Sequence, residues 1–171
     1  MPPTEWMTQE SPIIRVAARV VLFDHEDRLL LFRAVAPRAD GRSSRSFWIT
    51  PGGGVNAGEP LEGAARRELH EETGLEHFEL GPCVWLRRHV FHWEGAWIEQ
   101  RESYFVARTP VFEVNTDGHE ELERRFLQEH RWWSIAEIAA SADRFVPGNL
   151  ASLAAPLAAG QFPPEPVSVG V

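Results

Sequence analysis

The segment between Pro51 and Leu75 constrains the fold more than any other part of the sequence. It reads PGGGVNAGEPLEGAARRELHEETGL, and its proline and three consecutive glycines force a tight turn with close backbone approach. Pro60 suits the first turn of a helix and Gly74 suits a carboxyl-terminal cap. The sequence therefore predicts a sharp turn followed by one bounded helix over residues 60–73.

This helix carries carboxylates on the side that should be buried. At about 100° per residue, the apolar stripe consists of Leu61, Ala65 and Leu69. Glu68 and Glu72 are i,i+4 neighbours on the same stripe, and Glu71 lies on its flank. Carboxylates held together on a half-buried face repel one another and lose hydration, so they persist only if they are protonated or balanced by cations. The pattern therefore indicates a cation site.

A divalent metal is the simplest cation for such a face. Hard oxygen ligands favour Mg²⁺ or Mn²⁺ over zinc, and Mg²⁺ usually keeps waters and ligand phosphates in its shell. The alternative is a solvated charged face with i,i+4 Glu–Arg pairs, which is the commoner explanation for charged helices in general. The helical wheel favours the metal, and with it phosphate chemistry.

The rest of the chain alternates strand-like and helical patterns within one domain of the α/β class. The short DHED link makes the first two strands a hairpin, and a capping box from Ser134 to Glu137 begins a later helix. The predicted strands are 15–24, 28–34, 47–50, 78–93, 97–109 and 130–134, and the later helices are 134–141 and 148–159. We expect residues 1–12 to be a flexible arm, residues 13–160 the domain, and residues 161–171 a proline-rich extended tail.

Composition narrows the choice of partners. The 171 residues are 43% hydrophobic and carry a formal net charge of −8, which argues against a nucleic-acid polymer as partner because phosphate backbones are bound by surplus Lys and Arg. Cys83 is the only cysteine, so no intrachain disulfide can form. No leader-like start is present, and no run approaches the roughly 18 apolar residues that span a bilayer. We expect a cytoplasmic protein without a membrane partner, and a homodimer is compatible with the sequence.

The segment also resembles the signature of the Nudix hydrolase family, G-x5-E-x7-R-E-U-x-E-E-x-G-U, where U is a bulky apolar residue. The matching residues are Gly53, Glu59, Arg67, Glu68, Leu69, Glu71, Glu72, Gly74 and Leu75, without a departure. The resemblance implies a Nudix-type α/β/α sandwich on a mixed β-sheet. It also implies hydrolysis of a pyrophosphate linkage in a nucleoside diphosphate joined to another group, with Mg²⁺ or Mn²⁺ as cofactor.

The resemblance assigns roles by position. The implied metal ligands are Glu68, Glu71, Glu72 and the carbonyl of Gly52. Arg67 would orient a glutamate by a charge-assisted pair, and Glu59 would hold the loop that enters the helix. The general base is less fixed in the family: we favour Glu68, assisted by Glu121 or Glu123 in the run GHEELERR, although an acidic run of this kind is often only a solvated turn.

Two residues outside the signature are candidates for substrate binding. Arg33 ends the second predicted strand, where Nudix relatives often place a basic residue near phosphates, and its alternative is a surface ion pair of little energetic value. Trp48 lies just before the glycine turn, where it could stack on a base or pack in the core. The sequence is therefore compatible with both a substrate-binding and a structural role for Arg33 and for Trp48.

Three functional hypotheses follow. The first is a hydrolase of a small nucleotide derivative, such as a nucleoside triphosphate or a nucleotide sugar. The second is a Nudix-fold domain that binds a nucleotide or a partner without catalysis, in which we would expect a signature glutamate to be lost. An enzyme that processes capped RNA is disfavoured by the acidic charge.

Overall fold

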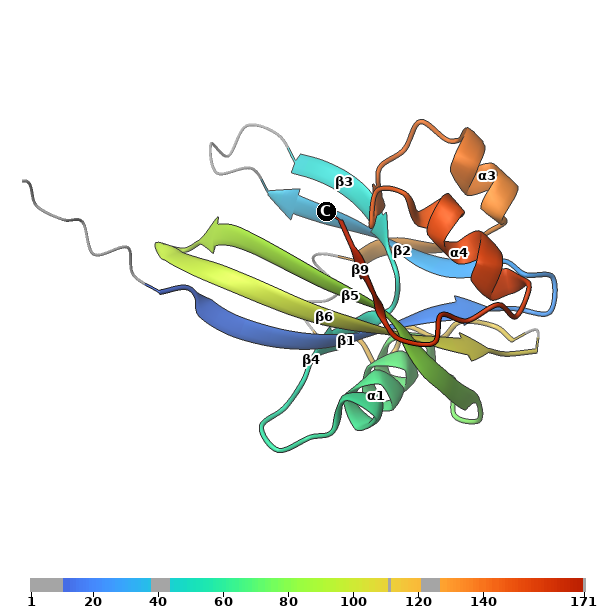
Figure 1. The fold of residues 1–171 in the computed structure, drawn as a ribbon, viewed down its shortest axis with the longest axis horizontal. Coiled ribbons are helices and arrows are strands. Elements are labelled where there is room, and N and C mark those ends of the chain that lie inside the picture. The colour runs from blue at the N-terminus through green and yellow to red at the C-terminus, as the bar shows by residue number, and fades with distance from the viewer. Residues whose placement is uncertain (1–10, 38–43, 111, 121–126, 171) are drawn as a thin grey trace, which may run out of the picture.

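The computed structural model describes residues 11–37, 44–110, 112–120 and 127–170. Its centre is one mixed sheet (Figure 1). The strand order is β8 (Phe145–Val146), β3 (Ser44–Ile49), β2 (Leu29–Pro37), β1 (Ile13–Phe23), β6 (Ala96–Arg108), β5 (Glu79–Trp93) and β9 (Val167–Val169). In addition, β4 (Gly52–Gly54) pairs with β1, and β7 (Leu127–Trp133) pairs with β2. The predicted α/β class and the mixed sheet are confirmed. No helix in the described part of the chain is long and apolar enough to cross a bilayer.

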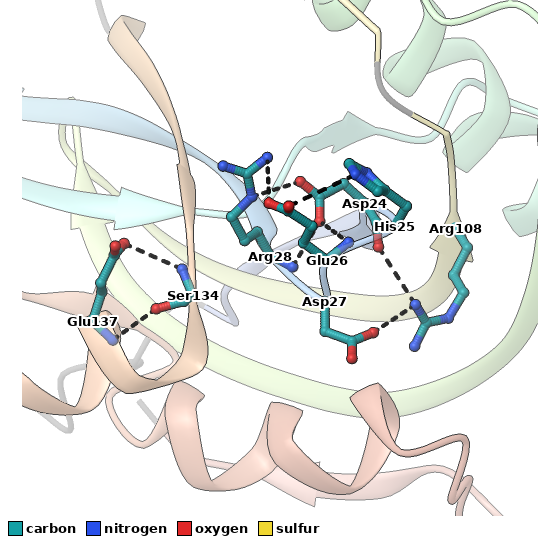
Figure 2. A network of polar contacts seen from close by, with 8 residues as sticks. All are labelled: Asp24, His25, Glu26, Asp27, Arg28, Arg108, Ser134 and Glu137. Atoms are coloured by element: carbon teal, nitrogen blue, oxygen red, sulfur yellow. Dashed lines mark hydrogen bonds and ion pairs between the residues drawn. The ribbon is translucent and has the colours of Figure 1, made fainter.

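The first two strands form the predicted hairpin. β1 (Ile13–Phe23) pairs antiparallel with β2 (Leu29–Pro37). In the link between them, the buried Asp24 carboxylate accepts hydrogen bonds from the backbone N–H groups of Glu26 and Arg28, both at 2.9 Å, and from Arg28 Nε at 2.8 Å (Figure 2). One side chain therefore closes the turn that the sequence DHED predicts.

The centre of the sheet is a parallel pair. β1 pairs with β6 (Ala96–Arg108) from residues 13 and 98 to residues 23 and 108. β6 in turn pairs antiparallel with β5 (Glu79–Trp93), and the turn between them places Glu94 and Gly95 at positive φ. The predicted long hairpin is thus confirmed, and it lies on one side of β1.

Shorter strands complete the sheet. β3 (Ser44–Ile49) and β7 (Leu127–Trp133) both pair antiparallel with β2, and β8 (Phe145–Val146) pairs in parallel with β3. At the opposite edge, β9 (Val167–Val169) pairs in parallel with β5. Part of the proline-rich tail is therefore a strand of the sheet.

Helices cover both faces of the sheet. α1 (Leu61–Thr73) packs on one face, and α3 (Ile135–Ala140) and α4 (Leu150–Ala158) pack on the other (Figure 1). Side chains along β1 point alternately to the two faces of the sheet, so successive residues belong to two different hydrophobic cores. The core under α1 includes Ala18, Val20, Leu22, Leu30, Phe32, Ala64, Ala65 and Leu69. The core under α3 and α4 includes Val21, Phe23, Leu29, Leu31, Tyr104, Val106, Ile138, Leu150 and Leu157.

The helix boundaries follow their capping signals. α1 follows Pro60 and ends at Gly74, which has φ 77° and donates its N–H to His70 O at 2.8 Å. α3 begins with the predicted capping box of Ser134 and Glu137 (Figure 2). Two wheel positions differ from prediction. Leu61 of the apolar stripe is 37% exposed, because the buried part of α1 begins only at Ala64, and Thr73, which the wheel places on the polar side, is 0% exposed.

Candidate active site

The glycine turn brings β4 against α1. β4 (Gly52–Gly54) pairs antiparallel with residues 17–19 of β1. Gly53 faces the carboxylate of Glu68, and a Cβ at this position would lie 2.6–2.7 Å from its carboxyl atoms. Gly52 has φ 147°, and a Cβ there would lie 2.4 Å from Ala18 O. Gly52 therefore requires glycine for the strand pairing, whereas Gly53 leaves the space that the Glu68 carboxylate occupies.

The helix turns its carboxylates toward this strand. Glu68 is 8% exposed and Glu72 is 3% exposed, so the inward direction predicted from the wheel is confirmed. Glu72 Oε2 accepts a hydrogen bond from the backbone N–H of Gly52 at 3.0 Å. Glu71 is half-buried at the side of the helix. The three carboxylates thus lie on the wall of α1 next to β4.

Arg67 ties these acidic groups together. Its guanidinium donates to Glu59 Oε1 and Oε2 at 2.9 Å, to Glu68 Oε1 at 2.9 Å, to Glu71 Oε2 at 3.3 Å, and to the Gly54 carbonyl at 2.9 Å. The Arg67 hydrogen bond, followed by one from the backbone N–H of Asn56, lowers the pKa of Glu59 to about 2. Arg67 therefore balances part of the negative charge and links the entry loop to the helix.

A segment after β6 packs on the end of α1. The backbone N–H of Asn115 donates to Thr73 O at 2.8 Å, and His119 Nε2 lies 2.8 Å from Glu72 O. Gly118 passes so close that a Cβ there would lie 2.5 Å from Glu71 O. The sequence did not predict this contact, because the segment has no periodic pattern and its partner residues lie more than 40 positions away. The glycine next to the histidine was the only local signal.

Two hollows are lined in part by residues of β2 and β7. One has a volume of about 570 Å³ and is lined by Phe32, Thr116, Asp117, His119, Leu127, Glu129 and His130. The other has a volume of about 300 Å³ and is lined by Arg33, Ser46, Trp48, Glu129, Asp143 and Arg144. Glu129 lines both hollows.

The two substrate-binding candidates meet at the smaller hollow. Arg33 forms an exposed ion pair with Glu129 at 3.2 Å. Trp48 is only 5% exposed, donates from Nε1 to Asp143 Oδ2 at 3.1 Å, and packs edge-on against Trp133 with ring centroids 5.1 Å apart. Trp48 is therefore a core residue whose edge lines a hollow. Glu121 and Glu123, the assisting bases of the prediction, lie outside the described residues.

The donor set suits a hard divalent cation, although its side chains are engaged elsewhere. Among the residues that the structure describes, no three His, Cys, Asp or Glu side chains converge on one metal position. The oxygen ligands available on α1 and β4 are of the type that Mg²⁺ and Mn²⁺ prefer. One oxygen of Glu68 and one of Glu71 accept hydrogen bonds from Arg67.

Comparison with known proteins identifies the family. The family model described as the NUDIX domain matches residues 13–154. The chain belongs to the Nudix hydrolase family. The resemblance read from residues 53–75 is thereby confirmed, and this Nudix chain is an enzyme of the pyrophosphohydrolase type.

Two relatives that match most of this chain share a name. The RNA pyrophosphohydrolase of Wolbachia pipientis from Culex pipiens is 28% identical over 151 residues, which cover 81% of this chain and 86% of the relative. The RNA pyrophosphohydrolase of Caulobacter vibrioides is 33% identical over 134 residues, which cover 67% and 71%.

Solved structures share the fold. A C. elegans Ap4A hydrolase in a binary complex has a TM-score of 0.59 and 21% identity, and the match covers 85% of this chain and 98% of that chain. A MutT protein from Methanosarcina mazei has a TM-score of 0.56 and 19% identity over 84% and 92%. The predicted Nudix-type architecture is confirmed.

The names of the relatives overturn one expectation. The exclusion of a nucleic-acid polymer as partner is wrong, because relatives that match most of this chain are named RNA pyrophosphohydrolase. The expectation came from the net charge of −8. Net charge averages over the whole surface, whereas an enzyme that acts on one end of a polymer needs cations only near that end.

Proposed function

We propose that this Nudix chain hydrolyses the pyrophosphate linkage at the 5′ end of a polyphosphorylated RNA, with Mg²⁺ or Mn²⁺ held by Glu68, Glu71, Glu72 and the Gly52 carbonyl. The observation that carries the proposal is the burial of Glu68 and Glu72 against the glycine strand, within an intact signature. Cations stabilise carboxylates on such a face, and a divalent metal would add to the positive charge that Arg67 supplies.

The metal and the side chains of α1 would have different roles in the reaction. A bound divalent cation neutralises charge on the phosphates and brings the pKa of a bound water into a usable range. Arg67 donates hydrogen bonds to Glu68 and Glu71 and would orient their carboxylates. Glu68 would accept the proton of the attacking water, with Glu121 or Glu123 assisting, as the resemblance implies.

The RNA end follows from the names of the relatives and from the chemistry of the bond. Internal linkages of RNA are phosphodiesters, so a pyrophosphate linkage occurs only at a 5′-polyphosphorylated end. The enzyme then needs to bind the terminal phosphates and a few nucleotides, which an acidic protein can do with a metal and local arginines. Arg33 at the smaller hollow is a candidate for phosphate contact.

A small nucleotide is the second candidate substrate. The larger hollow, at about 570 Å³, has the size of pockets that bind one small ligand, which run from roughly 300 to 1,000 Å³. A nucleoside triphosphate or a nucleotide sugar would present the same linkage to the same carboxylates. The two candidates differ in whether nucleotides beyond the first contribute to binding.

One assay tests the function and the substrate class together. The full chain is incubated with a 5′-triphosphate RNA oligomer, with nucleoside triphosphates and with nucleotide sugars, in Mg²⁺, in Mn²⁺ and with chelator. Release of phosphate and pyrophosphate is measured for the triphosphates, and release of nucleoside monophosphate is measured for the nucleotide sugars, whose cleavage frees neither. A 5′-monophosphate RNA serves as control. We expect metal-dependent release with kcat/KM highest for the triphosphate RNA. Higher kcat/KM for a free nucleotide would replace the RNA assignment. Absence of release from every substrate would overturn the hydrolase proposal in favour of a non-catalytic binding domain.

A further inference from the structure

The turn that begins β4 contacts Arg19 of β1 at both of its ends. Arg19 Nη1 donates to the carbonyl of Thr50 at 3.0 Å. At the other end of the turn, a Cβ on Gly52 would lie 2.6 Å from Arg19 Cα and 2.7 Å from Arg19 Cγ. One side chain therefore supports the turn from both ends.

The guanidinium of Arg19 is fixed by a buried carboxylate. Glu102 in β6, whose side chain is 3% exposed, accepts from Arg19 Nε through one oxygen and from Arg87 through the other. The hydroxyl of Tyr104 lies 3.4 Å from Glu102 Oε2. Burial tends to raise the pKa of Glu102, but Arg19 and Arg87 hold it below its usual value. The pair is therefore ionised and cannot easily rotate.

The turn that Arg19 supports also contacts α1 through Glu72. The backbone N–H of Val20 donates to Pro51 O at 2.9 Å, which fixes the middle of the turn on β1. The next N–H group along the turn, that of Gly52, donates to Glu72 Oε2 at 3.0 Å. The direction of this N–H depends on the peptide planes that Arg19 and Val20 hold.

Stability alone does not explain the presence of the buried ion pair between Arg19 and Glu102. Replacing such a pair by apolar side chains is often neutral or stabilising, since desolvation offsets much of the attraction. A planar guanidinium carries several N–H donors in a fixed forked geometry, which an apolar side chain does not. Here the fork joins a carboxylate of β6 to a carbonyl of the β3–β4 turn.

We propose that Arg19 is a positioning residue, which Glu102 holds in place and which fixes the Thr50–Gly52 turn so that the Gly52 N–H stays directed at the Glu72 carboxylate. The inference rests on the proposed function, in which Glu72 is a metal ligand. A hydrogen bond that orients a metal-binding carboxylate typically matters by about 10–100-fold in metal affinity or activity.

The test uses a matched pair of variants of the full chain. Arg19→Met removes the fork and leaves Glu102 paired with Arg87, whereas Arg87→Met removes the same charge from the other oxygen of Glu102, away from the turn. The first readout, hydrogen exchange of the Gly52 amide without metal, depends on neither metal binding nor catalysis. The second is the Kd of Mn²⁺, from the paramagnetic signal of the free ion. Thermal unfolding checks that both variants fold.

The expected results separate the two variants. Arg19→Met should exchange the Gly52 amide about tenfold faster or more and weaken Mn²⁺ binding about tenfold or more, while Arg87→Met changes each by less than about twofold. Equal effects of the two variants, or no effect of Arg19→Met, would overturn the inference. Should Arg19→Met fail to fold, Arg19→Lys, which keeps the charge without the planar fork, carries the same expectation.

These outcomes are separate from failure of the proposed function. A wild-type chain that neither binds Mn²⁺ nor hydrolyses any pyrophosphate would defeat the function. Dependence of Gly52 amide exchange on Arg19 would even then support the positioning role. A wild-type chain that does both, with Arg19→Met unchanged in amide exchange and Mn²⁺ affinity, would defeat the positioning role alone.

Discussion

The backbone N–H of Gly52 donates a hydrogen bond to Glu72 Oε2 across 3.0 Å. This contact joins the glycine strand to the helix, and it holds a carboxylate that is only 3% exposed. A backbone N–H takes up little room. It therefore gives the Glu72 oxygen that faces β4 a hydrogen-bond donor at a position where the strand has no side chain.

Glu72→Gln should separate catalysis from folding. The glutamine carbonyl can still accept the Gly52 N–H, but the charge that would bind the metal is gone. We expect kcat/KM with Mg²⁺ to fall by about 100-fold or more, with little change in Tm. Glu62→Gln, on the exposed side of the first turn of α1, is the control and should keep full activity. Unchanged turnover of Glu72→Gln would exclude Glu72 as a metal ligand.

Gly53→Ala and Gly54→Ala form a pair that differs only in what a methyl group meets. At Gly53 the added Cβ would lie 2.6 Å from Glu68 Cδ, whereas at Gly54 nothing lies within 4 Å. Gly53→Ala should displace the Glu68 carboxylate and lower kcat by about tenfold or more, and Gly54→Ala should change it by less than about twofold. Steady-state kinetics on both variants gives the comparison. Equal activity in the two would show that the position of Glu68 does not matter.

The stability of the folded chain should depend on Glu59 at acidic pH. The Arg67 hydrogen bond and the Asn56 N–H lower the pKa of Glu59 from 4.5 to about 2 in the folded chain. The stabilisation is therefore complete above pH 4.5 and is lost as the pH falls toward 2. Urea unfolding between pH 5 and pH 2.5 should show a steeper decline of the unfolding free energy in wild type than in Glu59→Gln. Parallel curves would contradict the assigned pKa.

Trp48→Phe should affect stability more than substrate binding. Phenylalanine keeps an aromatic ring against Trp133 but cannot donate to Asp143. We expect the free energy of unfolding to fall by about 1–2 kcal/mol, with KM changed by less than about twofold. A tenfold rise in KM at unchanged stability would instead identify Trp48 as a stacking platform for a base.

The sequence predicted the elements whose signals are local. Pro60 and Gly74 bound α1 within one residue, and Ser134 with Glu137 begins α3, because caps satisfy backbone groups at fixed spacing. The wheel placed Glu68 and Glu72 inward because apolar neighbours on the same stripe must be buried. The functional candidates in α1 therefore came from one short segment.

Features built from distant residues were missed for a physical reason. Arg19 and Glu102 are 83 positions apart, and neither is unusual in its own strand. β8 and β9 have only two and three residues, too few for a periodic pattern. The contact of His119 with the backbone of Glu72 depends on how the segment after β6 folds back. Only the assembled sheet brings these groups together.

The long parallel ladder between β1 and β6 sets the order in which the chain can mature. Residue 13 pairs with residue 98 and residue 23 with residue 108, so the central pairing joins the start of the domain to its middle. On a ribosome, β1 emerges first and has no parallel partner until β6 has left the exit tunnel. The glycine strand and α1 are made in that interval and must wait for the same event. Phe105 and Ala107 of β6 belong to the core under α1, so a nascent chain stalled before residue 96 would lack part of the surface on which α1 packs.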